Sequence, residues 1–497
     1  MEASFFSKVF GWLRKKTSEE TEEIERELPY ALMMFTMMAA SGISIYESWK
    51  RMRKISILKR FQKEAEEVVR QVEVLGKDPL TAMYDRAEKT DSKLYRDFLS
   101  GFVSSLKSGG KVVDYLKSKL RSIFELRNNA IVRSVEKIGT LVEAYAVMLI
   151  VAMCVYILYI VLSSTAMMEL LAKMRMPVMP YLSYLVVLFI MPLISIMFMA
   201  LAHNTHRSTL MNLKDVYKKA VLPISGAVIA VVMLAFIPSL NLIVQNLGWP
   251  LIVTIILVFA SLPSAIHYYK IAKANYIAES SLPSFIRDVT EARKIGLSPE
   301  KSIIHATKRK DYRSFSKLLS TIRSQIEWGV PLRKVFSGIK RKIQSWPVLV
   351  NFLVMIEAVE IGGAPSQALE VLSEYCEKER EVEVNKRSLL KPYIILSVIW
   401  SVLMALTTTV VAITIYVLTQ LTIPNLSPEM LQALVDQISV FSTGIIFQCW
   451  ISGFFIGKIS EGNFAAGFKY SALLAVTAYV SWLLSQNFLW SAYAAPS

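Results

Sequence analysis

The amino-acid sequence predicts an all-α integral membrane protein with about seven transmembrane helices and two homologous cytoplasmic helical-bundle domains. The first observation is composition, because hydrophobic residues make up 54% of the 497-residue chain and the mean hydropathy is +0.42. The second is a series of apolar runs of about 20 residues, the length that a helix needs to cross a bilayer. These runs lack the alternation of a barrel strand. The third observation is a polar segment that occurs twice.

The repeat begins as LPYALMMFTMMAASGISIYES at Leu28 and returns as LPSFIRDVTEARKIGLSPEKS at Leu282, 254 residues later. Further along, Gly109-Gly110 matches Gly362-Gly363. We therefore expect two copies of one helical domain. The first copy has the Met-rich stretch ALMMFTMMAA where the second has the polar FIRDVTEARK, so equal surface functions do not follow from the repeat. Identical residues at the spacing of 254 are Leu28, Pro29, Thr36, Gly42, Ser44 and Ser48, which fall on Leu282, Pro283, Thr290, Gly296, Ser298 and Ser302.

Apolar runs separate the copies and follow the second one. Both polar copies carry more Lys and Arg than Asp and Glu, which favours the cytoplasmic side of a membrane. Four predicted spans lie between the copies, and an even number returns the chain to its starting side. The last span then leaves the C-terminus outside the plasma membrane. The predicted spans lie at about 139–162, 178–202, 220–240, 247–266, 393–419, 437–457 and 468–489.

The predicted organisation has five parts. Residues 1–27 form an amphipathic and charged N-terminal segment, in which MEASFFSKVFGWLRKK suggests an interfacial helix. The acidic stretch Ser18–Glu27 then reads as a solvated lead-in. The remaining parts are the first cytoplasmic domain at 28–138, four spans at 139–266, the second cytoplasmic domain at 267–391, and three spans with a short external tail at 392–497.

Glycine, serine and proline mark the helix boundaries within each copy. In the second copy, Pro283 is expected to open a helix that ends near Gly296 in a left-handed cap. Ser298 then serves as N-cap with proline at the first helical position. A later charged helix is expected to break near Pro392. The predicted hinge and motif residues are Pro29, Gly42, Ser44, Gly109, Gly110, Pro283, Gly296, Ser298, Pro331, Gly362 and Gly363.

Catalytic and metal-binding patterns are missing. The sequence contains no G-x-x-x-x-G-K-[ST], HExxH or GxSxG motif. It therefore predicts that this chain does not hydrolyse ATP, is not an enzyme and binds no cofactor. The three cysteines and four histidines form no cluster with metal-ligand spacing. The net charge of +16 belongs mostly to the polar copies. Anionic lipid headgroups and an acidic protein are the expected counterparts, rather than nucleic acid.

The doubled domain resembles the type II secretion F superfamily, through the pattern L-P-x6-T-x5-G-[IL]-S, a mid-domain glycine turn and a late Gly-Gly before a helix. These are the inner-membrane platform proteins of type II secretion and type IV pilus machines. Four spans between two copies is similar to the archaeal platforms of the archaellum and of adhesive pili. The resemblance implies a non-catalytic homodimer that couples a hexameric secretion-type ATPase to the assembly of pilin-like or archaellin-like subunits.

We expect basic residues to dock the ATPase, because charges at an interface rim steer association. Two readings compete with the archaellum platform: a platform for an adhesive or DNA-uptake pilus, and, more distantly, a solute transporter. A transporter would need charged residues at membrane depth, and a membrane-embedded enzyme would need a polar site that the sequence lacks. The predicted docking bases are Arg287, Arg293, Lys294, Lys308, Arg309, Lys310, Arg313, Lys340, Arg341 and Lys342 in the second copy, and Lys50, Arg51, Arg53 and Lys54 in the first.

Overall fold

The computed structural model describes residues 2–162, 186–205, 210, 213–237, 247–309, 312, 315–362, 365–422 and 428–494. The described chain is almost entirely helical, which confirms the all-α prediction. It divides into two compact units. Unit 1 combines Met1–Ile131 with Ala274–Val384, and unit 2 combines Val132–Lys273 with Asn385–Ser497. Both copies of the repeat therefore belong to the same unit.

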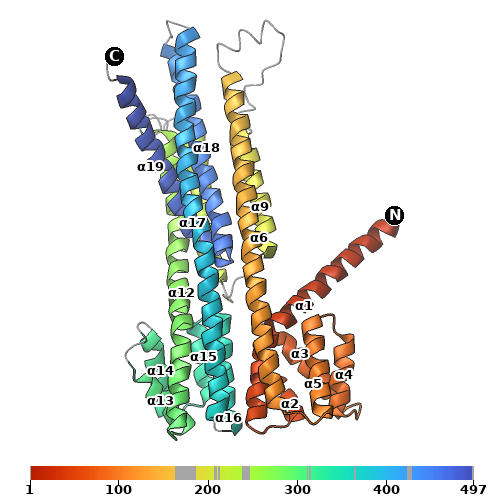
Figure 1. The fold of residues 1–497 in the computed structure, drawn as a ribbon. Coiled ribbons are helices and arrows are strands. Elements are labelled where there is room, and N and C mark those ends of the chain that lie inside the picture. Colours follow the sequence, from red (N-terminus) through yellow and green to blue (C-terminus); the bar gives the residue numbers. More distant parts are fainter. Residues whose placement is uncertain are drawn as a thin grey trace. The chain divides into compact units, whose positions relative to one another are not determined.

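The two copies have the same succession of helices (Figure 1). Copy 1 consists of the C-terminal part of α1 (Glu2–Ala40), α2 (Ile45–Met52), α3 (Lys59–Glu73), α4 (Pro79–Lys89), α5 (Lys93–Lys107) and the start of α6 (Val112–Leu162). Copy 2 consists of the end of α12 (Trp249–Lys294), α13 (Pro299–Thr307), α14 (Ser316–Glu327), α15 (Leu332–Lys342), α16 (Trp346–Gly362) and the start of α17 (Ser366–Thr422).

The predicted turns at the start of each copy are confirmed. Gly42 and Gly296 have positive φ angles of 79° and 88°, the left-handed conformation that glycine adopts without strain. Ser44 accepts the backbone N–H of Glu47 at the start of α2, at 3.3 Å. Ser298 plays the same part for α13. Of the other motif residues, Gly109 also has a positive φ angle, and Gly110 follows it. Pro331 is the N-cap of α15, and Gly362 is the last residue of α16. Gly363 lies outside the described residues.

The proline after Ser298 opens α13 as predicted, but other predictions based on proline were wrong. Pro283 does not open a helix, because it lies inside α12, and Pro29 lies inside α1. The charged helix does not break near Pro392, which is internal to α17. An interior proline costs a helix about 3 kcal/mol. Leu28 and Tyr30, on either side of Pro29, are fully buried, and Leu282, before Pro283, is 2% exposed. Packing of these residues against neighbouring helices opposes the cost of the proline.

The acidic stretch before copy 1 is also not a solvated lead-in. Its residues continue α1, and Glu27 is buried, with 3% of its surface exposed. The Glu27 carboxylate accepts the backbone N–H groups of Arg60 and Phe61 at 2.9 and 3.0 Å, at the start of α3. Glu25 accepts a hydrogen bond from Ser92 at 2.9 Å. These carboxylates therefore hold α1 against copy 1.

Unit 2 contains the membrane-spanning segments. Among the described residues, six helices are long and apolar enough to cross a bilayer, and a shorter apolar helix covers Leu188–His203. The second predicted span, 178–202, is therefore represented by its second half, because residues 163–185 lie outside the description. Unit 2 consists of the remainder of α6, α12 and α17 together with η1 (Val186–Ile190), α9 (Met191–Thr205), α10 (Lys214–Phe236), α18 (Pro428–Glu461), η4 (Phe464–Ala466) and α19 (Gly467–Ala494).

Candidate functional site

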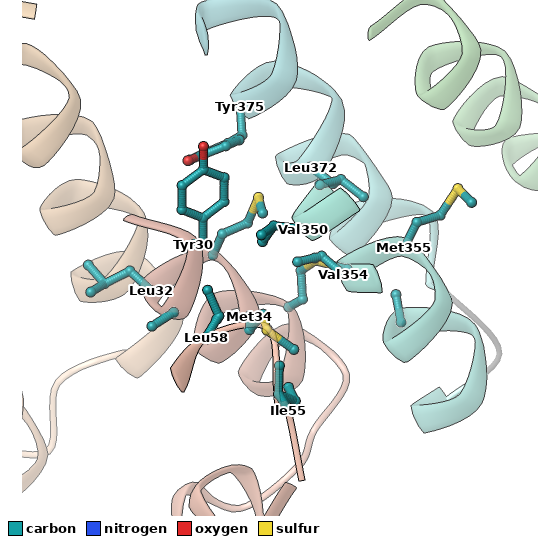
Figure 2. Packing of buried hydrophobic residues seen from close by; sticks show 14 of the residues in the cluster. Tyr30, Leu32, Met34, Ile55, Leu58, Val350, Val354, Met355, Leu372 and Tyr375 are labelled. Carbon is teal, nitrogen blue, oxygen red and sulfur yellow. The ribbon is translucent and has the colours of Figure 1, made fainter. Parts of the chain in front are cut away.

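The two copies meet at a buried junction in unit 1. Met34, Met37 and Met38 on α1 are at most 3% exposed. With Val354 and Ala358 of α16 they line a small cavity of about 10 Å³, close to the smallest space that holds one water molecule. Figure 2 shows Met34 of copy 1 beside Val354 of copy 2. One continuous hydrophobic core therefore joins the copies.

This junction explains why the first helix of copy 1 is rich in methionine where copy 2 is polar. At the spacing of 254 residues, Met34 and Met37 of copy 1 correspond to Asp288 and Glu291 of copy 2. Glu291 is exposed, whereas Met37 is buried against the other copy. The same structural position thus faces solvent in one copy and a protein surface in the other. The Met-rich helix is an internal interface of this chain.

Polar groups cross the junction beside the methionines. Tyr30 of α1 donates a hydrogen bond to Glu379 of α17, and Asn351 of α16 donates to the same carboxylate at 2.9 Å. Arg127 of α6 lies 3.7 Å from Glu379. Tyr30 and Tyr375 pack edge to face, with ring centroids 5.4 Å apart (Figure 2). Glu379 therefore connects side chains of four helices, α1, α6, α16 and α17.

A second set of charges lies at the end of α16. Arg333, near the start of α15, contacts Glu357 at 2.8 Å and Glu360 at 2.7 Å. Burial raises the pKa of the Glu357 carboxyl, and the charge of Arg333 opposes this shift. Arg51 and Lys54 of copy 1 also lower the pKa of Glu357, so their charges act across the junction. The charges of two of the predicted docking bases thus act on a carboxylate of the other copy.

The predicted bases at the end of α12, exposed at Arg287 and Lys294 and half-buried at Arg293, are paired within unit 1. Arg287 contacts Glu377 at 3.3 Å, and Lys294 contacts Glu370 at 2.8 Å. Arg293 donates a hydrogen bond to the backbone carbonyl of Leu297, in the turn that follows α12. These interactions attach the end of α12 to the start of α17. Exposed ion pairs are weak, with a median near 0–1 kcal/mol, so these side chains can still exchange partners.

The bases that follow α13 are partly described. Lys308 is exposed at the C-cap of the helix. Arg309 pairs with Asp288 of α12, whose carboxylate also accepts a hydrogen bond from the buried Tyr312. The remaining two predicted bases, Lys310 and Arg313, lie outside the described residues.

In copy 1 the corresponding bases also find partners. Lys50 and Arg53 contact the Glu73 carboxylate at 3.3 and 3.5 Å, and Arg51 contacts Glu47 at 3.6 Å. Lys54 is exposed.

The three bases at the end of α15 form a continuous exposed run. Lys340, Arg341 and Lys342 are all exposed, and none of them forms an ion pair with a residue that the structure describes. They are the last turn of the helix, where basic residues interact favourably with the helix dipole. Among the predicted docking bases, these three form the densest free positive charge in the described part of unit 1.

A set of exposed apolar residues on the turns was not predicted from the sequence. Trp328 is 85% exposed after α14, and Ile295 is 74% exposed after α12. In copy 1, Val74 and Leu75 are 73% and 60% exposed after α3. A signal was present in the sequence, since each residue lies one or two positions before a glycine turn, where a helix end leaves it without a packing partner. Singly exposed apolar residues are common, but here both copies repeat the feature.

The turns of copy 2 lie at one end of its bundle. Lys294, at the end of α12, contacts Glu370 near the start of α17. Arg333, near the start of α15, contacts Glu360 near the end of α16. The segments 295–298, 328–331, 360–362 and 365–366 therefore form a common surface, here called the turn end. Ile295 and Trp328 belong to the turn end.

Unit 2 is held together by buried polar contacts and by glycine. The Tyr145 hydroxyl of α6 lies 2.9 Å from Ser195 of α9 and 2.7 Å from Ser452 of α18, and Gln448 donates to Ser195 at 2.6 Å. Between α18 and α19, a side chain on Gly457 would overlap the backbone of Gly467. Small residues allow such close approach of membrane helices. The contacts describe a packed bundle.

Comparison with known proteins agrees with this architecture. A relative from Methanocaldococcus jannaschii, described as an uncharacterized protein, is 22% identical over 491 residues, which cover 93% of this chain and 80% of that protein. No solved structure matches the chain. The family model for type II secretion system (T2SS), protein F, matches residues 31–160 and 285–412. These two matches cover both copies and more than half of the sequence, so the chain belongs to the type II secretion system protein F family.

Proposed function

We propose that this chain is the non-catalytic membrane platform of an archaeal type IV pilus-like machine, most specifically of the archaellum. The observation that carries the proposal is the doubled family domain, packed as one unit and joined by α6, α12 and α17 to apolar helices. Each of these three helices contains residues of both units. The four spans predicted between the copies support an archaeal type of platform.

The chemistry of such a platform is contact rather than catalysis. A hexameric cytoplasmic ATPase binds unit 1, and pilin-like or archaellin-like subunits meet the membrane-spanning helices of a homodimer. The ATPase supplies the energy, so the platform needs no nucleotide site, in agreement with the missing phosphate-binding motif. We place unit 1 and both copies on the cytoplasmic side because of their excess of basic residues.

The turn end of copy 2 is the surface that we propose for the ATPase. It combines exposed apolar side chains, Ile295 and Trp328, with the predicted docking bases Arg293 and Lys294 beside them. An apolar centre with a charged rim is the usual composition of a protein interface. Tryptophan and arginine are also enriched among the residues that contribute most to binding.

The docking proposal is tested with full-length protein in nanodiscs and the purified ATPase. Trp328→Ser should weaken binding by about 30-fold, the effect of losing about 2 kcal/mol at a central interface residue. Tyr84→Ser is the matched control, because Tyr84 is an exposed aromatic residue of α4, 47% exposed, in copy 1. Arg309→Glu with Lys310→Glu tests the predicted basic cluster. Equal binding by Trp328→Ser and Tyr84→Ser would remove the turn end from the interface.

The filament is identified by deleting the gene, imaging surface filaments by electron microscopy and measuring swimming. Loss of the rotating filament and of swimming, with adhesive pili intact, is the expected result for an archaellum platform. Loss of adhesive pili or of DNA uptake alone would assign the chain to that other machine. Filaments of every kind remaining intact would refute a platform function.

A further inference from the structure

The basic turn at the end of α15 is fixed in place by hydrogen bonds to α12. Asn275 of α12 accepts the backbone N–H groups of Gln344 and Ser345 at 2.8 and 2.9 Å. Ser345 also donates its hydroxyl to Glu279 at 2.7 Å. These contacts lie at the opposite end of copy 2 from the turn end, here called the neck end, where α12 arrives from the apolar run 247–266. The exposed residues 340–342 are separated by Ile343 alone from the backbone that Asn275 binds.

The same part of α12 carries a belt of aromatic and basic residues. Tyr269 and Tyr276 are 56% and 51% exposed, and Lys270 and Lys273 lie between them. The Lys273 ammonium group lies 5.9 Å from the centre of the Tyr269 ring. Tyrosines and bases next to a span typically mark the level of the lipid headgroups. Asn275 is inside this belt, so the level of α12 to which the α15 turn is attached is the headgroup level.

We propose that Lys340, Arg341 and Lys342 form a binding site for anionic lipid headgroups. The three side chains are exposed and form no ion pair with a described residue, and they follow one another on a helix end whose position is set by the headgroup-level segment of α12. Each base near an anionic membrane surface contributes about 1 kcal/mol, which corresponds to a factor of about five in binding. The helix dipole alone would favour basic residues at this helix end, but it does not account for their attachment to the belt.

An acidic surface of a partner protein is the other occupant that this charge would suit. The structure favours lipid because the cluster lies at the neck end, whereas the exposed apolar residues of copy 2 that suit a protein partner, Ile295 and Trp328, lie at the turn end. The two ends of copy 2 would then bind different partners. The turn end contacts a protein, and the neck end contacts lipid headgroups.

Trypsin provides a direct test because it cleaves after lysine and arginine. Full-length protein is placed in nanodiscs of phosphatidylcholine alone or with phosphatidylglycerol, and cleavage after residues 340–342 is followed by mass spectrometry. We expect cleavage to slow by about tenfold in the anionic discs and to recover in high salt, which screens exposed charges. Cleavage after Lys111, an exposed residue in the turn between α5 and α6, is the internal control and should not change.

A variant tests whether the side chains themselves hold the lipid. Lys340→Gln with Arg341→Gln and Lys342→Gln should lower the amount of phosphatidylglycerol retained by the purified protein in native mass spectrometry. The control changes the same charge at exposed residues of copy 1, with Lys107→Gln, Lys111→Gln and Lys117→Gln. Equal cleavage of the wild type in neutral and anionic discs would overturn the proposal. Protection that requires the ATPase instead of the anionic lipid would overturn it as well.

Discussion

Replacing Met37 by glutamate, the residue at the equivalent position in copy 2, should separate the two copies of unit 1. Met37 is 3% exposed and contributes to the cavity wall with Val354 and Ala358. Removing a buried methionine side chain loses about 2 kcal/mol of apolar burial. The new carboxylate must also lose its hydration, because it enters a surface that the methionines and α16 exclude from water.

The free-energy cost of that dehydration can be estimated from Glu27, a buried carboxylate in the same unit. Burial raises the pKa of Glu27 to about 7 from 4.5, even though two backbone N–H groups lower it. A difference of 2.5 pKa units corresponds to about 3 kcal/mol. The total for Met37→Glu is therefore about 5 kcal/mol, comparable with the whole stability of a small domain.

Thermal unfolding in detergent and hydrogen exchange of α16 measure this effect. Met37→Glu should lower the melting temperature and increase exchange at residues 348–358. Glu291→Met makes the reverse change at the exposed equivalent position and should alter stability by no more than about 0.5 kcal/mol. Met37→Leu conserves volume and should cost less than about 1.5 kcal/mol. If Met37→Glu has the same melting temperature as Glu291→Met, Met37 is not buried between the copies and the proposed junction is wrong.

Three further predictions concern ion pairing, pH and helix contact. Arg86→Met should cost up to about 3 kcal/mol, because it removes the nearer base, at 2.7 Å, from the Glu64 carboxylate, which is 4% exposed and keeps only Arg60 at 3.8 Å. Arg70→Met, at an exposed pair, should cost less than about 1 kcal/mol in the same unfolding assay. Because the folded-state pKa of Glu27 is raised to about 7, the free energy of unfolding falls as pH rises from about 4.5 to 7. Glu27→Gln should reduce that fall by about 3 kcal/mol between melts at pH 5 and pH 8. An unchanged pH dependence would contradict a buried Glu27. Gly457→Ala should destabilise the α18–α19 contact by at least about 1–3 kcal/mol, whereas Gly226→Ala, where nothing lies within 4 Å, should leave melting unchanged.

Some features could be predicted because they depend on neighbours along the chain. A run of about 20 apolar residues indicates a membrane-spanning helix wherever it occurs. Gly296 followed by Ser298 and a proline specifies a left-handed turn and a capped helix through local geometry. The repeat is likewise a property of the sequence alone, and the family match covers both of its copies.

Proline was a less dependable signal because its effect competes with packing. Pro29 and Pro283 lie inside helices whose neighbouring residues are buried. Glu27 was misinterpreted for a related reason: in a run of acidic residues, nothing in the sequence distinguishes the one carboxylate that accepts N–H groups from α3.

The sequence by itself determined the helical membrane class, the two copies and most of the turns, since these follow from residue spacing, length and backbone preference. Only the tertiary structure decided what each surface faces. Met37 and Glu291 occupy equivalent positions, yet one is buried and the other is exposed. The pairing of Glu379 with Tyr30, and the absence of such pairing at Lys340–Lys342 among the described residues, depend on helices up to 349 residues apart in the chain. Burial and charge pairing are set by what lies across space, which local sequence does not specify.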